Sequence, residues 1–309
     1  MKNLSRILFV ASPETDNLPA FEQASTLASH HQAELVVLGV VDAVSGHWAA
    51  QVQEALIQDQ QAVLDNLVAV KPANISTCST RVRVGKAFVE IIREVQENPY
   101  DLVVKAPEQP MLISLGSTDR KLLRQCPSSL LLAHPRAKHG QQKILLAVDH
   151  EPDNPENEPL NQSLIDLATC LAISEFAQLH VLHVWHLEHE GFLRSARSGL
   201  THTEVDNLVK LESQQRHAWL AQFVERHCTE LGNHVREYLN PEIHVLQGSP
   251  REVVAEFAND EGIALIVMGT VARTGIQGFV IGNTAEHILN HIDCAVLAVK
   301  PAGFSSPVL

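Results

Sequence analysis

The sequence predicts an α/β protein made of two tandem copies of one domain, each with a doubly wound, parallel, five-stranded sheet. Three observations lead to this prediction. The length of 309 residues suits two domains of roughly 150 residues each. Four sequence blocks recur in the same order in the two halves of the chain. Within each half, short apolar runs alternate with stretches of helical periodicity, which is typical of a parallel sheet covered on both faces.

The internal repeat consists of matched segments whose offset grows along the chain. Four pairs match at offsets of 137, 144, 163 and 166, in this order: 7–12 with 144–149, 33–42 with 177–186, 85–104 with 248–267, and 116–135 with 282–301. The offset rises most between the second and third pairs. The second copy therefore contains an insertion between its second and third strands.

In the first copy, strands and helices are expected in strict alternation. The predicted strands are the short apolar or β-branched runs 7–11, 35–41, 79–84, 101–104 and 129–133. The predicted helices show helical spacing of apolar residues and cover 23–31, 48–70, 87–98 and 119–125. The polar segment 135–143, with proline and glycine, is the expected linker. The predicted domains span residues 1–137 and 143–309.

Composition limits the class of protein and of partner. Hydrophobic residues make up 45% and charged residues 19%, which indicates a globular chain. A net charge of −13, without a Lys/Arg run, argues against a nucleic-acid partner. The five cysteines lie far apart without a CxxC pair, as expected of free thiols in a reducing compartment.

No apolar run of this sequence approaches the roughly 18 residues of a membrane span, and the first run, 7–11, is too short for a signal peptide. The sequence therefore predicts a cytoplasmic protein that is not an integral membrane protein.

Residues 144–149, Gly269 and residues 282–284 give the second copy a pattern that resembles the universal stress protein (UspA) family. The tandem form, the length and the segment 267–289 strengthen this resemblance, which covers nearly the whole chain. It implies an adenine nucleotide alpha hydrolase-like fold and a role in the stress response.

The resemblance also implies how the two copies assemble. In this family, the final strands of two domains pair antiparallel across a two-fold axis. Here the final strands, 129–133 and 294–299, are expected to pair within one chain, giving a pseudo-dimer without exposed sheet edges between the copies. A homodimer of the whole chain is left open.

Nucleotide-binding members of the family carry an aspartate after the first strand and a glycine-rich loop that ends in Gly-Ser/Thr. Glycines let the backbone approach phosphate, and the helix that follows attracts anions. The resemblance implies a ligand site at six residues of the second copy: Asp149, Gly269, Thr270, Gly282, Asn283 and Thr284. The match is incomplete, because Ala272 replaces the second glycine and Asn283 replaces Ser/Thr. Asn283 is expected to cap the helix instead.

The first copy departs further from the family pattern. Ser12 stands at the aspartate position, and Ala106 and Gln109 stand at two glycine positions. Residues 116–118 keep the Gly-Ser/Thr pattern, but Asp119 is expected to place a negative charge beside any phosphate. The first site is therefore predicted to be degenerate.

The sequence predicts a small-molecule-binding protein rather than an enzyme, because it contains no GxSxG, no P-loop lysine motif and no Cys/His nucleophile pair. The expected ligand of the second domain is ATP or another phosphorylated or lipid-like molecule. Two alternatives stay open. One is an ATP-binding switch or slow ATPase, and the other is an interaction module with vacant clefts.

The insertion contains a second candidate for ligand binding. Residues 190–209 carry Phe192, Leu193 and two arginines in a loop-like stretch, which could hold a phosphorylated or amphipathic molecule. A solvated loop leading into a helix is the simpler interpretation.

Histidines form a further candidate. His180, His183, His186 and His189 recur every three residues, but on a strand their side chains face opposite ways and exclude a four-histidine site. A metal site from His150, His186 and His189, with Asp149, is an alternative to ordinary surface histidines.

Overall fold

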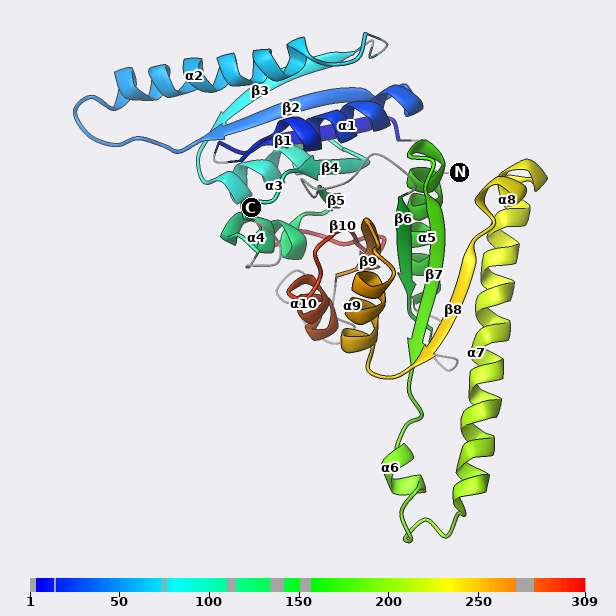
Figure 1. The fold of residues 1–309 in the computed structure, drawn as a ribbon. Helices are drawn as coiled ribbons and strands as arrows, with labels where there is room; N and C mark the ends of the chain where they lie inside the picture. Colours follow the sequence, from blue (N-terminus) through cyan, green and yellow to red (C-terminus); the bar gives the residue numbers. More distant parts are fainter. Residues whose placement is uncertain are drawn as a thin grey trace.

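The computed structural model of the chain describes residues 4–13, 15–73, 75, 77–109, 115–133, 142–150, 157–270 and 281–308. Ten strands of this part form one continuous sheet with helices on both faces (Figure 1). Most of the predicted linker lies outside the described residues. So does the glycine-loop position Ala272.

The first half alternates strands and helices as the sequence predicts. Its strands are β1 (Arg6–Ala11), β2 (Glu34–Val41), β3 (Cys78–Val84), β4 (Leu102–Lys105) and β5 (Ser129–Leu132). Its helices are α1 (Leu18–His31), α2 (Ala49–Ala69), α3 (Ala87–Glu97) and α4 (Ser117–Gln125). The only large shift of a boundary is at α1, where a proline in the first turn starts the helix early.

The second half repeats this order and adds helices. Its strands are β6 (Lys143–Val148), β7 (Gln178–Trp185), β8 (Glu242–Gln247), β9 (Leu265–Gly269) and β10 (Ala295–Val299). Its helices are α5 (Glu158–Ser174), α6 (Glu190–Leu193), α7 (His202–Leu231), α8 (Asn233–Leu239), α9 (Pro250–Asp260) and α10 (Asn283–Leu289). Between β7 and β8, the three helices α6, α7 and α8 take the place of the single helix α2, so the second half has two helices more.

The strand order of the sheet is β3-β2-β1-β4-β5-β10-β9-β6-β7-β8. Within each half all strand pairs are parallel, and the order reverses once, between β1 and β4 and between β6 and β9. The halves join through the antiparallel pair β5–β10, in which Leu131 lies opposite Leu297. The predicted pairing of the final strands is confirmed.

Along the strands, successive side chains point to opposite faces of the sheet, and each face forms one hydrophobic core. Ile7 and Phe9 of β1 face a core that also contains buried side chains of α1, α2, α5 and α7. Leu8 and Val10 face the opposite core, which contains buried side chains of α3, α4, α9 and α10. Burial on both sides explains why the strands read as continuous apolar runs.

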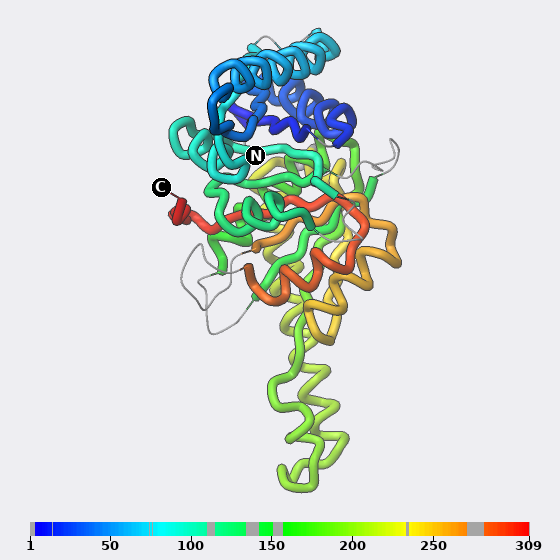
Figure 2. Tube along the Cα trace, turned by 90° about the vertical axis from the view of Figure 1, so that its left-hand side faces the viewer, coloured from blue at the N-terminus to red at the C-terminus, as the bar shows by residue number. Residues whose placement is uncertain are grey.

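The insertion forms an arm that projects beyond the sheet (Figures 1 and 2). Its main element, α7, has 30 residues and a length of about 45 Å. It begins with a capping box between Thr201 and Glu204. The expectation of a loop up to residue 209 was wrong, because the helix starts at His202. Arg194 is ion-paired with Glu190 and Asp206, both at 2.8 Å, which leaves it poorly placed for a phosphate.

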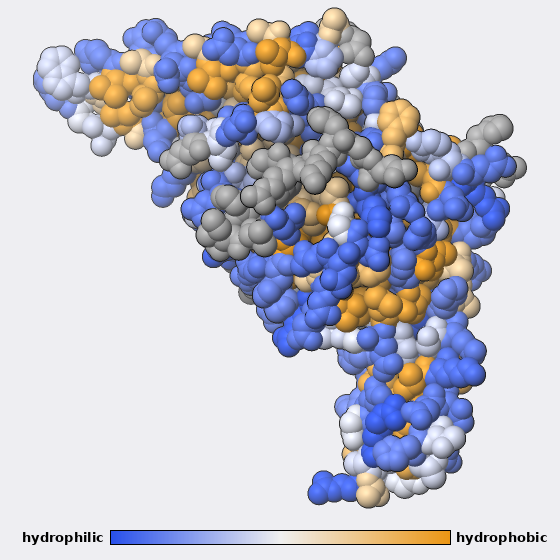
Figure 3. Space-filling model, in the orientation of Figure 1, coloured by the Kyte–Doolittle hydropathy of each residue, from blue (hydrophilic) through white to orange (hydrophobic). Residues whose placement is uncertain are grey.

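Beside its buried stripe, α2 leaves apolar side chains partly exposed, and orange side chains appear along the top of Figure 3. Trp48, which precedes the helix, and Val52, Leu56 and Val63 are exposed there. Only Gln60 and Leu64 of the helix are buried against the rest of the domain. Among the described helices, none is long and apolar enough to cross a membrane.

Candidate ligand site at the carboxyl edge of the sheet

The structure brings the six predicted site residues to one edge of the sheet. β6 and β9 are parallel neighbours, so Asp149 and Thr270, which follow them, leave the sheet on the same side. The N–H of Gly282 donates to the carbonyl oxygen of Thr270 at 3.1 Å, which places the start of α10 there too. Asn283 and Thr284 follow directly. This is the point where strand order reverses, and open α/β sheets bind ligands at such points.

An asparagine fixes the backbone at the end of the first strand of each half. Asn161 of α5 donates its amide N–H to the carbonyl oxygen of Asp149 at 2.7 Å, and its Oδ1 accepts the Asp149 N–H at 3.4 Å. In the first half, Asn17 makes the same pair of hydrogen bonds with Ser12, both at 2.8 Å. Asp149 and Ser12 therefore occupy matching, anchored positions.

The start of α10 differs from the expectation in one detail. Gly282 occupies the N-cap position, and Asn283 is the first helical residue without a side-chain capping bond. The predicted capping role of Asn283 was wrong. The side chains of Asn283 and Thr284 are exposed, and amides in the first turn of a helix have no acceptor within the helix. Both features suit contact with an anionic group.

Thr270 lies at the junction between the halves rather than in the open part of the edge. Its buried hydroxyl donates to the carbonyl oxygen of Leu123 in α4 at 3.2 Å and accepts a hydrogen bond from Lys300 Nζ at 2.7 Å. Lys300 Nζ also donates to the Leu123 carbonyl. Desolvation lowers the pKa of Lys300 to about 8. Thr270 therefore contributes its carbonyl, which holds Gly282, and its hydroxyl locks the two halves together.

Aromatic side chains pack behind Asp149. His150 stacks on Trp219 of α7 at a centroid distance of 3.9 Å, and Arg216 donates to the carbonyl oxygen of His150 at 2.7 Å. His183 is buried, with Nδ1 3.3 Å from the Val148 carbonyl oxygen. Desolvation lowers the pKa of His183 to about 4 and also lowers that of His150. Both rings are thus neutral at pH 7.

The structure does not bring together His150, His186 and His189, which the sequence analysis considered as a metal site. His186 and His189 are exposed beyond the end of β7, whereas His150 packs on α7. Within the described residues, the group that meets the spacing of a metal site consists of His180, Glu242 and His244. Sequence reasoning missed this group.

The corresponding cleft of the first half is a cavity of about 380 Å³ at the ends of β1, β2 and β4. Its lining includes three carboxylates, Asp42, Asp59 and Glu108, together with Ser12 and Lys105. An excess of acidic groups disfavours a phosphorylated ligand in this cavity.

Glu108 occupies the place where a phosphate would meet α4. Its Oε2 accepts the N–H of Thr118 at 3.1 Å, in the first turn of the helix. A Cβ atom added to Gly116 would lie 2.0 Å from the same oxygen, so the glycine is needed for this close approach. The helix end is already neutralised by an internal carboxylate.

Asp119, in contrast, does not face the phosphate position as the sequence suggested. It is fully buried, with Oδ1 2.8 Å from Lys105 Nζ and Oδ2 accepting the N–H of Glu108 at 2.7 Å. Desolvation raises the pKa of Asp119. The acidic group that blocks the first site is therefore Glu108, and Asp119 supports the loop that carries it.

Replacement of Glu108 by alanine should expose the first-turn amides of α4 to solution anions. The unfolding free energy should fall by about 1 kcal/mol through loss of the capping bond. Sulfate should then raise the midpoint of thermal unfolding more in Glu108→Ala than in the original chain. Glu108→Gln, which keeps a neutral acceptor, is the control. An identical sulfate response in all three proteins would contradict this explanation.

Together these features define the class of protein. Two parallel α/β units, fused through their final strands, each contain a switch point of the sheet, the place where such sheets bind ligands. At the first switch point acidic side chains line a cavity, and at the second stand an aspartate and two glycines.

The comparisons with known proteins agree with this class. The model of the universal stress protein family matches residues 3–134 and 141–300. The chain therefore belongs to the universal stress protein family.

Individual relatives match most of the chain. The chain is 29% identical over 227 residues to universal stress protein E of Escherichia coli (strain K12), covering 72% of this chain and 68% of the relative. It is 23% identical over 231 residues to universal stress protein E of Photorhabdus laumondii, covering 72% and 69%.

Solved structures show the same fold over the whole chain. A functionally unknown protein from Pseudomonas aeruginosa PAO1 superposes with a TM-score of 0.67 at 24% identity, covering 96% of this chain and 93% of that one. A universal stress protein from Archaeoglobus fulgidus gives a TM-score of 0.65 at 14% identity, covering 96% and 98%.

Proposed function

We propose that the chain is a cytoplasmic stress-response protein that binds a small molecule in its second half without transforming it. The observation that carries this proposal is the convergence of Asp149, Gly269 and Gly282 at the β6–β9 switch point. A carboxylate opposite two glycines suits a ligand with an N–H-bearing or hydroxyl-bearing part and an anionic part.

Each residue has a defined task in this proposal. Asp149, held by Asn161, accepts a hydrogen bond from a base or sugar. Gly282, at the start of α10, lets the backbone approach the ligand. Gly269 leaves room for Leu160 of α5, which packs against the end of β9. Asn283 and Thr284 offer exposed side chains and first-turn amides to an anionic group. ATP, or another phosphorylated or lipid-like molecule, has the chemistry that these groups recognise.

The contrast between the two halves supports the second as the binding site. In the first half, Ser12 replaces the aspartate and Glu108 occupies the start of the helix. The cavity there is lined by three carboxylates. Coulomb repulsion therefore disfavours a phosphorylated ligand in the first half.

Asp149→Ala should lower the affinity for the ligand at least tenfold, because a hydrogen bond to a charged acceptor contributes about 1.5–3 kcal/mol. Native mass spectrometry of the purified full chain would identify a co-purified molecule, and calorimetry with ATP and Mg²⁺ would give the affinity. Ser12→Ala, at the matching position of the first half, is the control and should change nothing.

The alternatives give different results in the same experiments. A slow ATPase would release phosphate from Mg-ATP, whereas the proposed binding protein releases none. An interaction module with vacant clefts would carry no co-purified molecule and give no heat with millimolar ATP. The absence of a co-purified molecule together with the absence of heat would contradict the proposal.

A further inference from the structure

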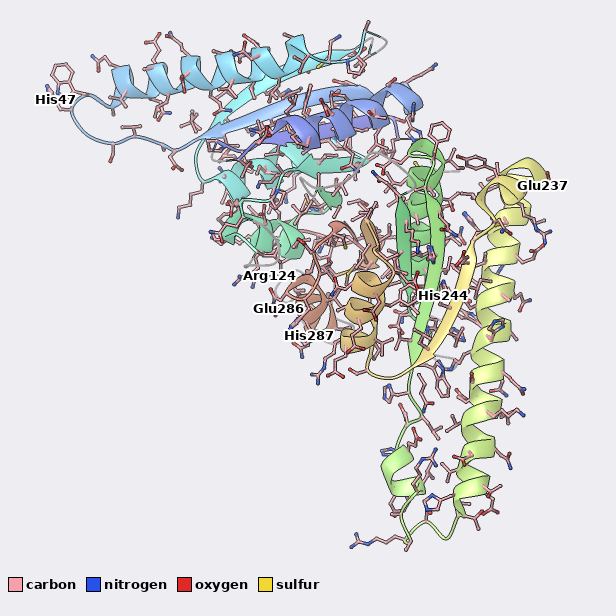
Figure 4. The ribbon with its side chains drawn as sticks, in the orientation of Figure 1. His47, Arg124, Glu237, His244, Glu286 and His287 are labelled. Carbon is pink, nitrogen blue, oxygen red and sulfur yellow. The ribbon has the colours of Figure 1, made fainter. Side chains whose placement is uncertain are left out.

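A cluster of histidine and glutamate side chains lies at the opposite edge of the sheet from the ligand site. His180 lies near the start of β7, and Glu242 and His244 lie at the start of β8. The strands pair in parallel with His180 opposite Glu242 and Leu182 opposite His244, so the three side chains share one face. Figure 4 labels His244 on β8.

The distances within the cluster match those between ligands of one small cation. His180 Nδ1 lies 3.1 Å from His244 Nε2 and 3.6 Å from Glu242 Oε2. His244 Nε2 lies 3.9 Å from Glu242 Oε2. A point inside this triangle is about 2.1 Å from all three atoms, and Zn²⁺ binds imidazole nitrogen at about 2.0–2.1 Å and carboxylate oxygen at about 2.0–2.2 Å.

The two imidazoles face each other through ring nitrogens, which are common metal ligands. At 3.1 Å, their facing nitrogens hold one proton between them as an N–H···N hydrogen bond. A cation would displace this proton into solvent, and the ring that lost it would take up another proton on its far nitrogen, so that both imidazoles stay neutral.

The position of His180 gives a second sign that this cluster is more than a surface contact. The side chain is 1% exposed, and its Nε2 atom has no hydrogen-bond partner. The ring is instead held by packing, since Phe257 of α9 lies against both His180 and His244. This packing holds Nδ1 towards His244 and Glu242, so the orientation of the ring is fixed without help from Nε2.

The charges around the cluster also favour a cation. Glu242 Oε1 accepts a hydrogen bond from Gln178 at 2.5 Å, which orients the carboxylate. The nearest positive charge, on Lys143, is neutralised by an ion pair with Glu261 at 2.8 Å. The net charge of Glu242, Glu261 and Lys143 is therefore negative.

We propose that His180, Glu242 and His244 bind one divalent transition-metal ion of the Zn²⁺ class. Two imidazoles and one carboxylate favour such an ion over Mg²⁺ or Ca²⁺, which take oxygen ligands. Glu242 and His244 are partly exposed, so water completes the coordination. The site is separate from the proposed ligand cleft. The ion links the edge strand β8 to β7 and thereby stabilises this edge of the sheet.

The test is metal binding by the full, tag-free chain after removal of bound metals. Competition with a chromophoric Zn²⁺ chelator should show one tight site per chain, and Co²⁺ should give the visible absorption of a low-symmetry site. His244→Ala and Glu242→Gln should each weaken the Zn²⁺ affinity at least tenfold. Zn²⁺ should also raise the melting temperature of the original chain by several degrees, and that of the two variants by much less.

His186→Gln is the matched control, because His186 is exposed just beyond β7 and outside the cluster. It should bind Zn²⁺ like the original chain. Circular dichroism shows whether the variants are folded. If His244→Ala does not fold, Glu242→Gln still tests the proposal, because Glu242 is exposed and its replacement should not disturb the fold. The proposal is overturned if the original chain binds no Zn²⁺, or if both cluster variants bind it as tightly as His186→Gln does.

Discussion

Replacement of Asp119 by alanine is expected to lower the free energy of unfolding by about 3–5 kcal/mol, because the buried ammonium of Lys105 would lose its counter-ion. Lys105 Nζ lies 2.8 Å from Asp119 Oδ1, and both side chains are almost fully buried. Asp119 also accepts the N–H of Glu108. Urea-induced unfolding followed by circular dichroism would measure the loss.

Two further proteins make this expectation specific. Glu252→Ala removes one partner of the exposed Arg251–Glu252 pair and should cost less than about 0.5 kcal/mol. The double variant Lys105→Met, Asp119→Leu should recover much of the lost stability, since neither charge is then buried. A loss for Asp119→Ala no larger than that for Glu252→Ala would show that the buried pair does not matter.

The second large effect concerns Lys300 and the pH dependence of stability. Its pKa falls from 10.5 to about 8 on folding, because desolvation disfavours the charged ammonium. The unfolded chain therefore binds more protons between pH 8 and pH 10.5, and stability should rise with pH across this window. The shift corresponds to roughly 3 kcal/mol.

Lys300→Met removes this contribution, so the difference in unfolding free energy between the original chain and the variant should change with pH. The original chain should gain up to roughly 3 kcal/mol relative to the variant from pH 8 to pH 10.5. Taking the difference cancels the titration of the other groups. Lys210→Met, on the exposed face of the arm, should show a constant difference. If the difference in unfolding free energy for Lys300→Met also stays constant with pH, the pKa of Lys300 is not lowered on folding.

The fold of the first half could be predicted from sequence because its elements have strong apolar periodicity, as in α3. The arm could not be predicted in this way. Most of α7 faces solvent, and apart from Val205 its buried residues, such as Leu220 and Phe223, lie in its second half. A helix without an apolar stripe gives no periodic signal. Its start was nonetheless present in the sequence as the capping box of Thr201 and Glu204.

The candidate site could be predicted in part. Asp149, Gly269 and Gly282 could be named because their spacing resembles that of the family's nucleotide-binding members. The occupation of the first site by Glu108, and the bonds of Thr270 to Leu123 and Lys300, depend on side chains that only the tertiary fold brings together. The cluster of His180 and His244 likewise depends on the register between strands 64 residues apart in sequence.

The antiparallel pair β5–β10 has a consequence for how the two clefts can diverge. When identical subunits associate through such strands, every substitution alters both clefts at once, and loss of one means loss of both. Covalent fusion removes that coupling: each assembly contains one copy of either half, held together at a high effective concentration. Glu108 can therefore occupy the start of α4 in the first half while the second half carries Asp149. The fused chain thus resembles a heterodimer of two different domains, except that a peptide linker joins them.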